Sequence, residues 1–496
     1  MKKVLAIYTA LLGLCALAQQ PAGVVSRGDL LKRRAYETFN ALTLYVDTTG
    51  NDANACTASG TNACLTIQGA LNKVPRHIHH PVTITVGAGT FGCAYISDFS
   101  FWEPASASAG AYLLLQGTLA NATLATGTAT GTSTAATAPS FSPMTFGTIT
   151  DTTQTWTVND LRGRFVVVGA NIIPIASNTA TTITYVGITS LGTGAGIAYT
   201  IQDPSTILSG TACNIPASGV TAQATGASAA MLVLSNAGGN SYQSGTFTIR
   251  RMQFTNATGR GIAIIDQGAT QIQEVKFATV AGTPIFMDVA GAPGSRLRVV
   301  NSSFNIPSGL SGILNTNTSP GSNVLFVTNV AMFGDGFSGL NLFVRYANIA
   351  GTSIALSSAG NVPLSMAGLT EGYVLYNKFD CGSNATSVGI RVIENQTSTN
   401  GWVPAQVTMS VVDISNCGTG VLDNGAIDFT GLVSGSGNTT ALSIVRGGKM
   451  EIRSTTTITG TTEISLDGTA YTLADLRALS PKQITDVTTL STIREP

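Results

Sequence analysis

A pair of apolar landmarks recurs through the second half of the chain at a nearly constant spacing. Phe254 is followed eight residues later by Ile262, and the same step separates Phe277 from Ile285. Equivalent landmarks, looser toward the C-terminal end, are Phe304 with Ile313, Met332 with Leu340, Phe379 and Ile414. Over the first four repeats the landmark moves by 23, 27 and 28 residues. A repeat of this length is one supersecondary unit, and it constrains the architecture more than any other feature of the sequence.

Each repeat contains only short apolar runs, which are separated by Gly, Asn and Ser. Charged residues make up 10% of the chain and there are 55 glycines, which is typical of many short strands joined by tight turns. Such a unit cannot bury its apolar face alone, but it can do so when it stacks on copies of itself. The sequence therefore predicts an all-β fold, a parallel β-helix whose coils stack at about 4.8 Å.

One short segment before the repeats has the pattern of a helix. In "LTIQGALNKVP" the apolar residues Leu65, Ile67, Ala70, Leu71 and Val74 fall on one face, and the run ends before a proline. The first predicted strand, "VTITVGAGTF", follows shortly after it. An open β-helix end exposes unpaired strand edges, which proteins cover with a helix or a loop. We therefore predict that this segment is an N-terminal cap helix.

The entry segment "LYVDTTGNDAN…TIQGALNKVP…VTITVGAGTF" resembles that of right-handed parallel β-helix proteins of the pectate-lyase-like superfamily. This superfamily includes secreted polysaccharide-active proteins and bacteriophage tailspikes. The close resemblance covers residues 43–91 and continues loosely, through the repeats, to about residue 455. It implies a right-handed coil. It says little about function, because the fold carries lyases, hydrolases, adhesins and structural shafts.

The repeat divides the chain into successive regions. We expect the N-terminal cap and the first coils at 43–117, a small inserted β-module at 118–208, and the β-helix body at 209–455. The insert begins with the low-complexity run "TATGTSTAATAPS" and continues with alternating apolar residues, which favours a small antiparallel sheet. Residues 456–496 are expected to form a C-terminal cap or an oligomer contact, with a helix at 473–479 that a proline stops.

The N-terminus has the pattern of a secretory signal. Lys2 and Lys3 precede an apolar run from Val4 to Ala18, which ends on a small-x-small triplet. This run is too short to span a membrane comfortably. We therefore expect a signal-like hydrophobic segment at 1–18, a linker at 19–42 and no stable membrane span. The alternative is an uncleaved hydrophobic helix that is buried in an assembly.

Cysteine counting supports export. Of the seven cysteines, Cys15 lies within the signal-like segment, which leaves an even six. Six cysteines allow fifteen connectivities, and spacing along the chain guides our choice among them. Neither a CxxC motif nor a Cys/His zinc spacing is present in the sequence. We expect an extracellular, secreted or virion-surface protein with the disulfides Cys56–Cys64, Cys93–Cys213 and Cys381–Cys417.

Charge and histidine placement limit the classes of partner. Lysine plus arginine and aspartate plus glutamate are both 25, so no basic excess indicates a nucleic-acid partner. His77, His79 and His80 lie in the turn between the cap segment and the first strand. They have the chemistry to bind a transition metal, but no fixed geometry supports a site and a solvated turn also explains them. No metal and no cofactor is predicted.

Four acidic residues, Asp266, Asp288, Glu394 and Asp423, follow the second landmark of their repeats. On stacked coils Asp266 and Asp288 would lie about 5 Å apart, which is close to the carboxylate separation of retaining glycosidases. This pair is the catalytic candidate. The competing interpretation, which we favour, is that strand-end acids accept hydrogen bonds from turn N–H groups. Glu394 and Asp423 are candidate ligand-binding residues.

Aromatic residues matter if the ligand is a sugar, because ring faces pack against the C–H surfaces of pyranoses. Tyr373, Tyr376 and Trp402 form the best local concentration and are candidate ligand-binding residues. Arg296 and Arg298 lie one repeat after the second candidate acid, but they match no lyase motif of the superfamily. The resemblance therefore assigns them no role.

These observations favour a surface-displayed β-helix that recognises carbohydrate. It would resemble a phage tailspike or tail fibre, form a homotrimer and bind a cell-surface polysaccharide. The alternatives are a secreted polysaccharide lyase or glycoside hydrolase, and a purely structural surface protein. A cluster of carboxylates and basic residues would favour the enzyme, whereas a smooth Thr/Ser/Asn face with isolated aromatics would favour binding or scaffolding. Whether the protein is an enzyme is left open.

Overall fold

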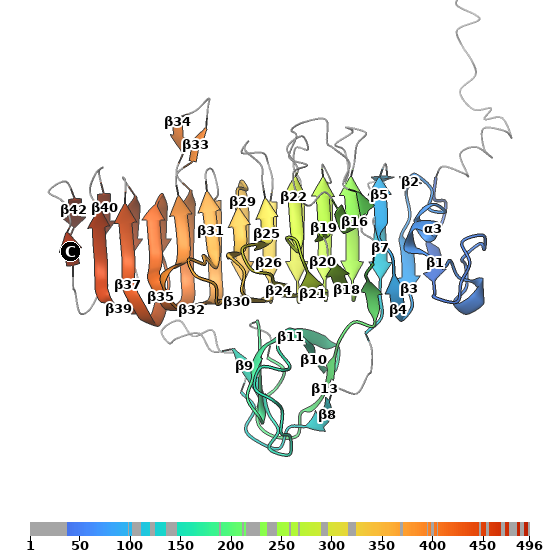
Figure 1. The fold of residues 1–496 in the computed structure, drawn as a ribbon, viewed down its shortest axis with the longest axis horizontal. Helices are drawn as coiled ribbons and strands as arrows, with labels where there is room; N and C mark the ends of the chain where they lie inside the picture. The colour runs from blue at the N-terminus through green and yellow to red at the C-terminus, as the bar shows by residue number, and fades with distance from the viewer. Residues whose placement is uncertain are drawn as a thin grey trace, which may run out of the picture.

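The chain forms an elongated rod of stacked coils, with a smaller sheet attached to one side (Figure 1). The computed structural model describes residues 37–97, 99–101, 111–119, 125–134, 146–187, 190–210, 213–214, 229–235, 246–256, 259–265, 268–288, 296–315, 324–367, 371–393, 395–397, 401–403, 405–445, 448–452, 456–467, 472–475, 484–486 and 491–494.

Each coil contributes one strand in turn to three parallel sheets, which we call A, B and C. Sheet A contains β1 (Leu42–Val46), β3 (Val82–Val86), β7 (Tyr112–Gln116), β17 (Thr246–Arg250), β20 (Ala269–Gln273), β23 (Arg296–Val300), β26 (Val324–Thr328), β29 (Tyr346–Ala350), β36 (Ala426–Phe429), β38 (Lys449–Ile452), β40 (Thr472–Asp475) and β42 (Ser491–Arg494). Sheet B contains β4 (Gly89–Phe91), β14 (Thr206–Leu208), β18 (Gln253–Asn256), β21 (Lys276–Val280), β24 (Ser303–Ile306), β27 (Ala331–Gly334) and β30 (Ser353–Leu356).

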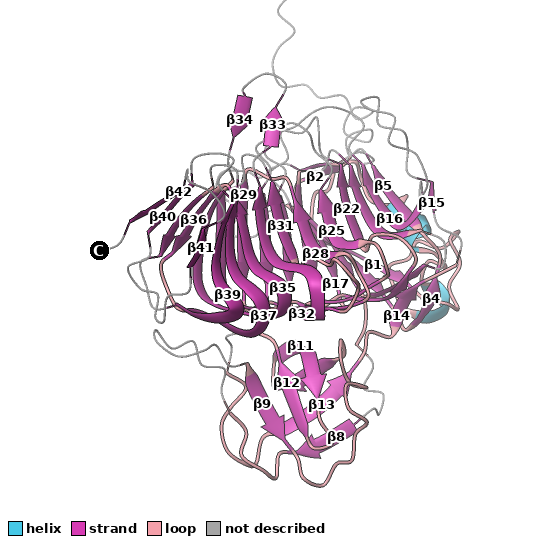
Figure 2. Cartoon of the chain, turned by 60° about the vertical axis from the view of Figure 1, so that its left-hand side comes forward, coloured by secondary structure: helices cyan, strands magenta, loops and turns pink. Residues whose placement is uncertain are grey.

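Sheet C completes each coil. It contains β5 (Ala94–Ser97), β16 (Ala229–Ser235), β19 (Arg260–Ile265), β22 (Ile285–Asp288), β25 (Ser311–Asn315), β28 (Ser338–Leu342), β31 (Leu364–Ala367) and β41 (Ile484–Asp486). Four long strands run through more than one sheet: β32 (Glu371–Ile393), β35 (Gln406–Asn424), β37 (Val433–Val445) and β39 (Thr456–Asp467). Figure 2 shows the stacked strands of the rod from a second direction. The predicted parallel β-helix is confirmed.

The landmark pairs of the sequence occupy equivalent positions on successive coils. In sheet B, Phe254 pairs with Phe277, and Phe277 pairs with Phe304. The same column then continues through Met332, Ile354, Phe379 and Ile414. In sheet C the second landmark forms the column Ile262, Ile285, Ile313, Leu340, Leu364 and Ile390. All of these side chains are buried in one continuous core.

The turn from sheet A to sheet B uses one residue in the left-handed region on most coils. These residues, with φ between 47° and 62°, are Arg251, Glu274, Asn301, Asn329, Gly351, Tyr376 and Val411. A positive φ is uncommon outside glycine and asparagine, and for a β-branched residue such as Val411 it is strained. The turn is therefore held by the coils on either side of it rather than by local preference.

An inserted sheet leaves the rod at the same turn, between β7 and β14. It contains β8 (Ala125–Thr128), β9 (Gly147–Thr150), β10 (Phe165–Val168), β11 (Asn171–Asn178), β12 (Thr182–Tyr185) and β13 (Ala198–Gln202), paired antiparallel in the order β8-β13-β10-β11-β12-β9. The predicted small β-module is confirmed. Since β14 pairs with β4 and β18 of sheet B, the last residues of the range predicted for the insert belong to the coil.

The insert packs against the A-to-B turns of several coils. Its apolar cluster includes Tyr376 and Val411 of these turns, and Ala331 at the start of β27. The hydroxyl of Ser303 donates a hydrogen bond of 2.6 Å to the carbonyl of Gly163, a residue of the insert. These contacts lie on successive coils, so the insert is seated along the rod rather than tethered only at its ends.

A short helix covers the N-terminal end of the rod, as predicted. Helix α3 (Ile67–Leu71) has Thr66 as its N-cap, whose side chain accepts a hydrogen bond from the N–H of Gly69 at 2.8 Å. It packs across β1, β3 and β5. Ile67, Ala70, Leu71 and Val74 are buried, whereas Leu65 is 45% exposed. The assignment of Leu65 to the buried face was wrong because it precedes the helix and the spacing rule does not apply to it.

The entry loop before this helix is held by Asp52. Its Oδ1 accepts from the N–H groups of Leu65 and Thr66 at 2.9 Å each, and its Oδ2 accepts from the Thr66 hydroxyl at 2.7 Å. The loop also includes the short 3-10 turn η1 (Gly60–Asn62). Two minor pairs complete the described elements: parallel β2 (His77–Ile78) with β6 (Ser100–Phe101), and the antiparallel hairpin β33 (Asn395–Thr397) with β34 (Gly401–Val403). Strand β15 (Cys213–Asn214) pairs antiparallel with β16.

The coil continues beyond residue 455, where the sequence predicted the body to end. Strands β39, β40, β41 and β42 extend the sheets to Arg494. The helix predicted at 473–479 is wrong at its start, because Thr472–Asp475 is a strand of sheet A. Residues 476–483 lie outside the described residues. Register with the preceding coil overrides the helical preference of residues 473–475.

All three predicted disulfides are present: Cys56–Cys64, Cys93–Cys213 and Cys381–Cys417. The first closes the entry loop, and the third joins two neighbouring coils. Disulfides of this kind persist in oxidising compartments. Within the described residues, no helix has the length and apolar character needed to cross a membrane. The signal-like segment at 1–18 lies outside the described residues.

The stacked phenylalanines of sheet B predict a strong packing effect. Phe277 is 1% exposed and its ring lies between those of Phe254 and Phe304, with centroid distances of 5.2 and 4.6 Å. We expect Phe277→Ala to lower the free energy of unfolding by about 3–5 kcal/mol, because it leaves a cavity in the core. Denaturant unfolding followed by circular dichroism measures this. The control is Phe326→Ala, a partly exposed ring on the outer face, for which a loss of equal size would contradict the core assignment.

A buried carboxylate organises the insert. Asp151 is completely buried, and it accepts hydrogen bonds from Thr153, Thr130, Gln154 and the Tyr199 hydroxyl, the last at 2.7 Å. Burial alone would raise the pKa of Asp151, but the hydrogen bonds from Thr153, Tyr199 and Gln154 outweigh it and lower the pKa from 3.8 to about 2. The ionised form is therefore the one that the insert stabilises.

This lowered pKa predicts how the insert responds to acid. Since the folded pKa lies below the unfolded value, the contribution of Asp151 is complete above pH 3.8 and is lost as the pH falls toward 2. We expect Asp151→Asn to destabilise the insert by about 2 kcal/mol at neutral pH and to flatten this acid dependence. Trp156 packs edge-on against Tyr199 and reports the change by fluorescence, once Trp102 and Trp402 are replaced by Phe. An unchanged acid transition in Asp151→Asn would contradict the assignment.

Candidate carbohydrate-binding face

The two acids of the predicted catalytic pair are not brought together by anything that the structure describes. Asp266 lies outside the described residues. Asp288 ends β22, and the residue of the preceding coil in register with it is Ile265. The pair therefore stays a prediction.

The two acidic ligand candidates have different outcomes. Glu394 lies outside the described residues. Asp423 lies in the sheet C part of β35, in register with Val392 and Ile444, and it is completely buried. Its Oδ1 accepts a hydrogen bond of 2.8 Å from the N–H of Gly425. The carboxylate thus stabilises the turn after β35, and its burial keeps it away from a ligand at the surface.

The three aromatic candidates lie on different surfaces. Tyr373 lies on the outer face of sheet A, between the inward-facing residues Gly372 and Val374. Tyr376 occupies the left-handed position of the A-to-B turn and packs against the apolar cluster of the insert. Trp402 lies in the hairpin strand β34, and its side chain lies outside what the structure describes. Only Tyr373 therefore has a described side chain on an open sheet face.

The histidine turn contains no described metal site. Within the described part of the chain, no group of three or more His, Cys, Asp or Glu side chains is arranged to hold a metal ion. The ring of His77 is hydrogen-bonded to the hydroxyl of Ser100, and the backbone N–H groups of His79 and His80 donate to the hydroxyl of Thr38. These contacts join the pre-strand segment to the first coil.

Tyr373 belongs to a row of three aromatic rings on the outer face of sheet A, which we call the aromatic ladder: Phe326, Tyr346 and Tyr373. Neighbouring rings have centroid distances of 5.8 Å each and are tilted by 53° and 45°. The three residues come from β26, β29 and β32, which are successive strands of the sheet. All three are partly exposed, and the residues beside them in each strand point into the core.

The strand pattern explains why the ladder faces outward. In "VLFVT" of β26, Leu325 and Val327 are buried, so Phe326 between them must point to the opposite side. The next two strands repeat this alternation around Ala347 and Ile349, and around Val374. A solvent-facing aromatic ring in a coil with a complete core contributes little to packing. Three such rings side by side form a contiguous, partly exposed aromatic surface, which is a candidate binding surface.

Polar and charged groups surround the ladder. Arg298 is in register with Phe326, Asn348 is in register with both Phe326 and Tyr373, and Thr408 follows Tyr373. Arg296 and Arg298 are both exposed. Neither forms an ion pair with any described residue. Aromatic faces for sugar rings, with amides, hydroxyls and guanidinium groups beside them for sugar hydroxyls and charges, are the chemistry of carbohydrate recognition.

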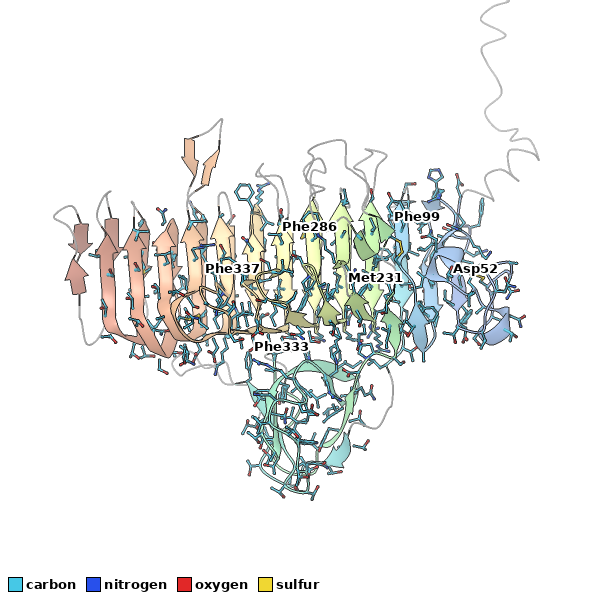
Figure 3. The ribbon with its side chains drawn as sticks, in the orientation of Figure 1. Asp52, Phe99, Met231, Phe286, Phe333 and Phe337 are labelled. Atoms are coloured by element: carbon cyan, nitrogen blue, oxygen red, sulfur yellow. A yellow bond between two sulfur atoms is a disulfide. The ribbon has the colours of Figure 1, made fainter. Side chains whose placement is uncertain are left out.

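The insert does not cover this face in the described structure. Its contacts are with the A-to-B turns and with sheet B, where the guanidinium of Arg162 lies over the ring of Phe333 at 5.1 Å from the centroid. Figure 3 shows Phe333 on the side of the rod that carries the insert. Burial lowers the pKa of Arg162, and the nearby Asp380 partly offsets this. Among the described residues, the apolar cluster of the insert includes no member of the ladder.

Sequence reasoning found one member of the ladder and missed two. Tyr373 was chosen for its local concentration of aromatic residues, whereas Phe326 and Tyr346 lie in a segment whose aromatic residues were not considered as ligand-binding candidates. The signal that could have found them is the strand alternation, because both occupy the outward phase of a strand with buried neighbours. Their grouping needs the register between coils, which the irregular repeat lengths hide.

Comparison with known proteins gives fold-level likeness only. No protein-family model matches the sequence, and no curated protein is similar to it. Among solved structures, the chain is similar to a glycoside hydrolase at 10% identity, covering 91% of this chain and 95% of that one with a TM-score of 0.29. It is also similar to XylC in a complex with xylose, at 9% identity, 90% and 86% coverage and a TM-score of 0.30. The tailspike protein gp49 from Pseudomonas phage LKA1 matches at 10% identity, 93% and 74% coverage and a TM-score of 0.27. These values are too low to support an argument, so the fold assignment rests on the strand register described above.

Proposed function

We propose that the protein is a surface-displayed β-helix that binds a cell-surface polysaccharide along the outer face of sheet A. The observation that carries this proposal is the aromatic ladder. Three partly exposed rings on successive strands offer tilted faces at a centroid distance of 5.8 Å, on a sheet whose core is already complete. A polymer of sugar rings can pack on more than one of these faces at once, which gives affinity through repetition rather than through one deep pocket.

The rigidity of the support favours the same function. Each ladder residue lies on a strand that is bonded to a strand on both sides, so its backbone position is fixed before a ligand arrives. Preorganised groups lose little conformational entropy on binding. The hydroxyls of Tyr346 and Tyr373 and the amide of Asn348 supply hydrogen-bonding groups beside the rings. The three disulfides support display outside the cell, in an oxidising compartment.

Substitution of the ladder tests this proposal. We expect Tyr346→Ala and Tyr373→Ala each to weaken polysaccharide binding by about tenfold, because each variant loses a ring that packs on a sugar. The size of this effect is taken from the stacking of nucleic-acid bases on aromatic rings, which contributes about 1–3 kcal/mol per base. Binding is measured on an array of bacterial surface polysaccharides and then by calorimetry with the polymer that binds most tightly. Both residues are partly exposed, so the variants should fold.

The matched control is Tyr112→Ala. Tyr112 is also a partly exposed tyrosine on the outer face of sheet A, five coils before Tyr346 in the register, or about 24 Å away. Its loss should leave the affinity unchanged. Equal losses in all three variants, or none in either ladder variant, would contradict the proposed site.

The same assay separates binding from cleavage. If the Asp266 and Asp288 pair is catalytic, the bound polymer will release reducing ends, and Asp288→Asn will abolish the release while binding persists. We expect no effect of Asp288→Asn on function, because an acid that only accepts hydrogen bonds from turn N–H groups takes no part in catalysis. The predicted homotrimer and the tailspike-like role remain part of this proposal, and sedimentation of the intact chain measures the oligomeric state.

A further inference from the structure

The charges around the aromatic ladder are separated by sign along the rod. On the N-terminal side, Arg296 and Arg298 project from β23, the strand that precedes the first ladder residue. Arg345, which is also exposed, precedes Tyr346 and therefore lies beside the middle ring of the ladder, one coil before Glu371. On the C-terminal side, Glu371 is exposed on β32 and lies in register with Tyr346. The exposed arginines therefore lie on the coils from β23 to β29, and the acidic residue of this face lies on the last coil of the ladder, β32.

The two arginines are arranged to bind an anion. They alternate with the buried residue Leu297, so both guanidinium groups project from the same face of one strand, two residues apart. Neither is neutralised by a carboxylate within the described part of the chain. This contrasts with Arg250 and Arg251 on a nearby coil, which are both paired with the buried Glu274 at 2.9 and 2.7 Å. Guanidinium forks bind carboxylate or phosphate groups through two parallel hydrogen bonds.

The acidic side limits where a negative group can lie. Glu371 is three coils beyond the arginines in the register, which is about 14 Å. Further along the same face come the carboxylates of Asp428 and Glu451, with one exposed ammonium at Lys449. A ligand with a negative charge on every sugar would place some of these charges against Glu371. Like charges at a binding face cost affinity, and they select against the wrong partner.

We infer that the ligand is a heteropolysaccharide that carries a carboxylate or phosphate on one sugar of its repeat and leaves the neighbouring sugars uncharged. The anionic group binds Arg296 and Arg298, and the uncharged sugars pack along Phe326, Tyr346 and Tyr373 toward Glu371. This assignment rests on the proposed function, because it specifies the ligand class of the same face. Neutral polymers would fit less well than this ligand, because they have no group to bind the two arginines. Uniformly charged polyuronates would also fit less well, because Glu371 repels their carboxylates.

The first experiment uses the intact chain and an array in three classes. The classes are neutral polymers such as dextran and xylan, bacterial capsular polysaccharides with one acidic sugar in each repeat, and uniformly charged polymers such as polygalacturonate and alginate. We expect the tightest binding in the second class. The polymer that binds most tightly is then measured again after its carboxylates are reduced to alcohols or after its phosphate substituents are removed with hydrofluoric acid. Loss of affinity after one treatment identifies which anion binds.

Variants assign the effect to the arginines. Arg298→Gln should weaken binding of the native polymer by about tenfold or more, because it removes a charge-assisted hydrogen-bonding group. It should have no effect on the polymer whose anionic group has been removed. Glu371→Gln should raise the affinity for polygalacturonate, since it removes the repulsive charge. Lys378→Gln is the control: Lys378 is an exposed cation on β32, on the outer face of sheet B, and its loss should change nothing.

The outcomes separate this inference from the function on which it rests. If the chain binds no polysaccharide in any class, the proposed function fails and the ligand class fails with it. If the chain binds through the ladder but binds neutral or uniformly charged polymers as tightly as polymers with one acidic sugar in each repeat, only the ligand class is overturned. The same conclusion follows if Arg298→Gln weakens binding of the native and the anion-free polymer equally. If Arg298→Gln is selective for the native polymer and Tyr373→Ala weakens both, the inference stands.

Discussion

The register between successive coils is the constraint on which the rest of the structure depends. Each coil pairs in parallel with the next, so a residue in one strand fixes the position of its counterpart in the following strand. The column of Phe254, Phe277 and Phe304 in sheet B keeps this register, because a slip of one residue would turn buried rings outward. The same register that stacks the core also stacks the outer face, and it therefore determines which surface residues become neighbours.

The inward-facing and outward-facing residues of each coil have separate roles. The inward-facing residues form a complete core without the outer face, since the main cluster of buried side chains runs from the cap to Leu466 in β39. Outward residues are consequently free to change without loss of the fold. This freedom allows a row of aromatic rings and a sign change in charge to exist on sheet A. Strand pairing holds these groups in place, which a loop-based site could do only with additional contacts.

The A-to-B turn is where the chain carries its inserted sheet. On most coils it consists of one residue with a positive φ, and between β7 and β14 it carries the whole insert. The insert then packs back on the same turns of later coils, through Tyr376 and Val411 among others. A left-handed valine is an unusual choice, and its burial beneath the insert shows that the surrounding contacts hold the backbone there. The described part of the insert thereby lies against sheet B and the turns, and none of its described contacts involves the ladder on sheet A.

Much of the fold could be read from the residues themselves. The eight-residue step from Phe254 to Ile262 recurs because each coil must bury one residue in sheet B and one in sheet C, and this requirement is visible in a single sequence. The helical pattern before the first strand and the even count of six cysteines are local or arithmetic signals, so the cap and the three disulfides could also be predicted. Local signals failed where register overrides them, as in the strand β40 that was expected to be a helix.

What only the tertiary structure decided is the composition of the outer face. Repeat lengths vary from coil to coil, so the sequence does not show that Arg298 is beside Phe326 or that Tyr346 is beside Glu371. Strand-end acids illustrate the same limit: Asp423 looks like a ligand from its position in the repeat, but burial and its bond to Gly425 make it a turn residue. The sequence by itself determined which residues must be buried, because burial follows the period of the chain. It could not determine which exposed residues meet, because that depends on how coils of unequal length align in space.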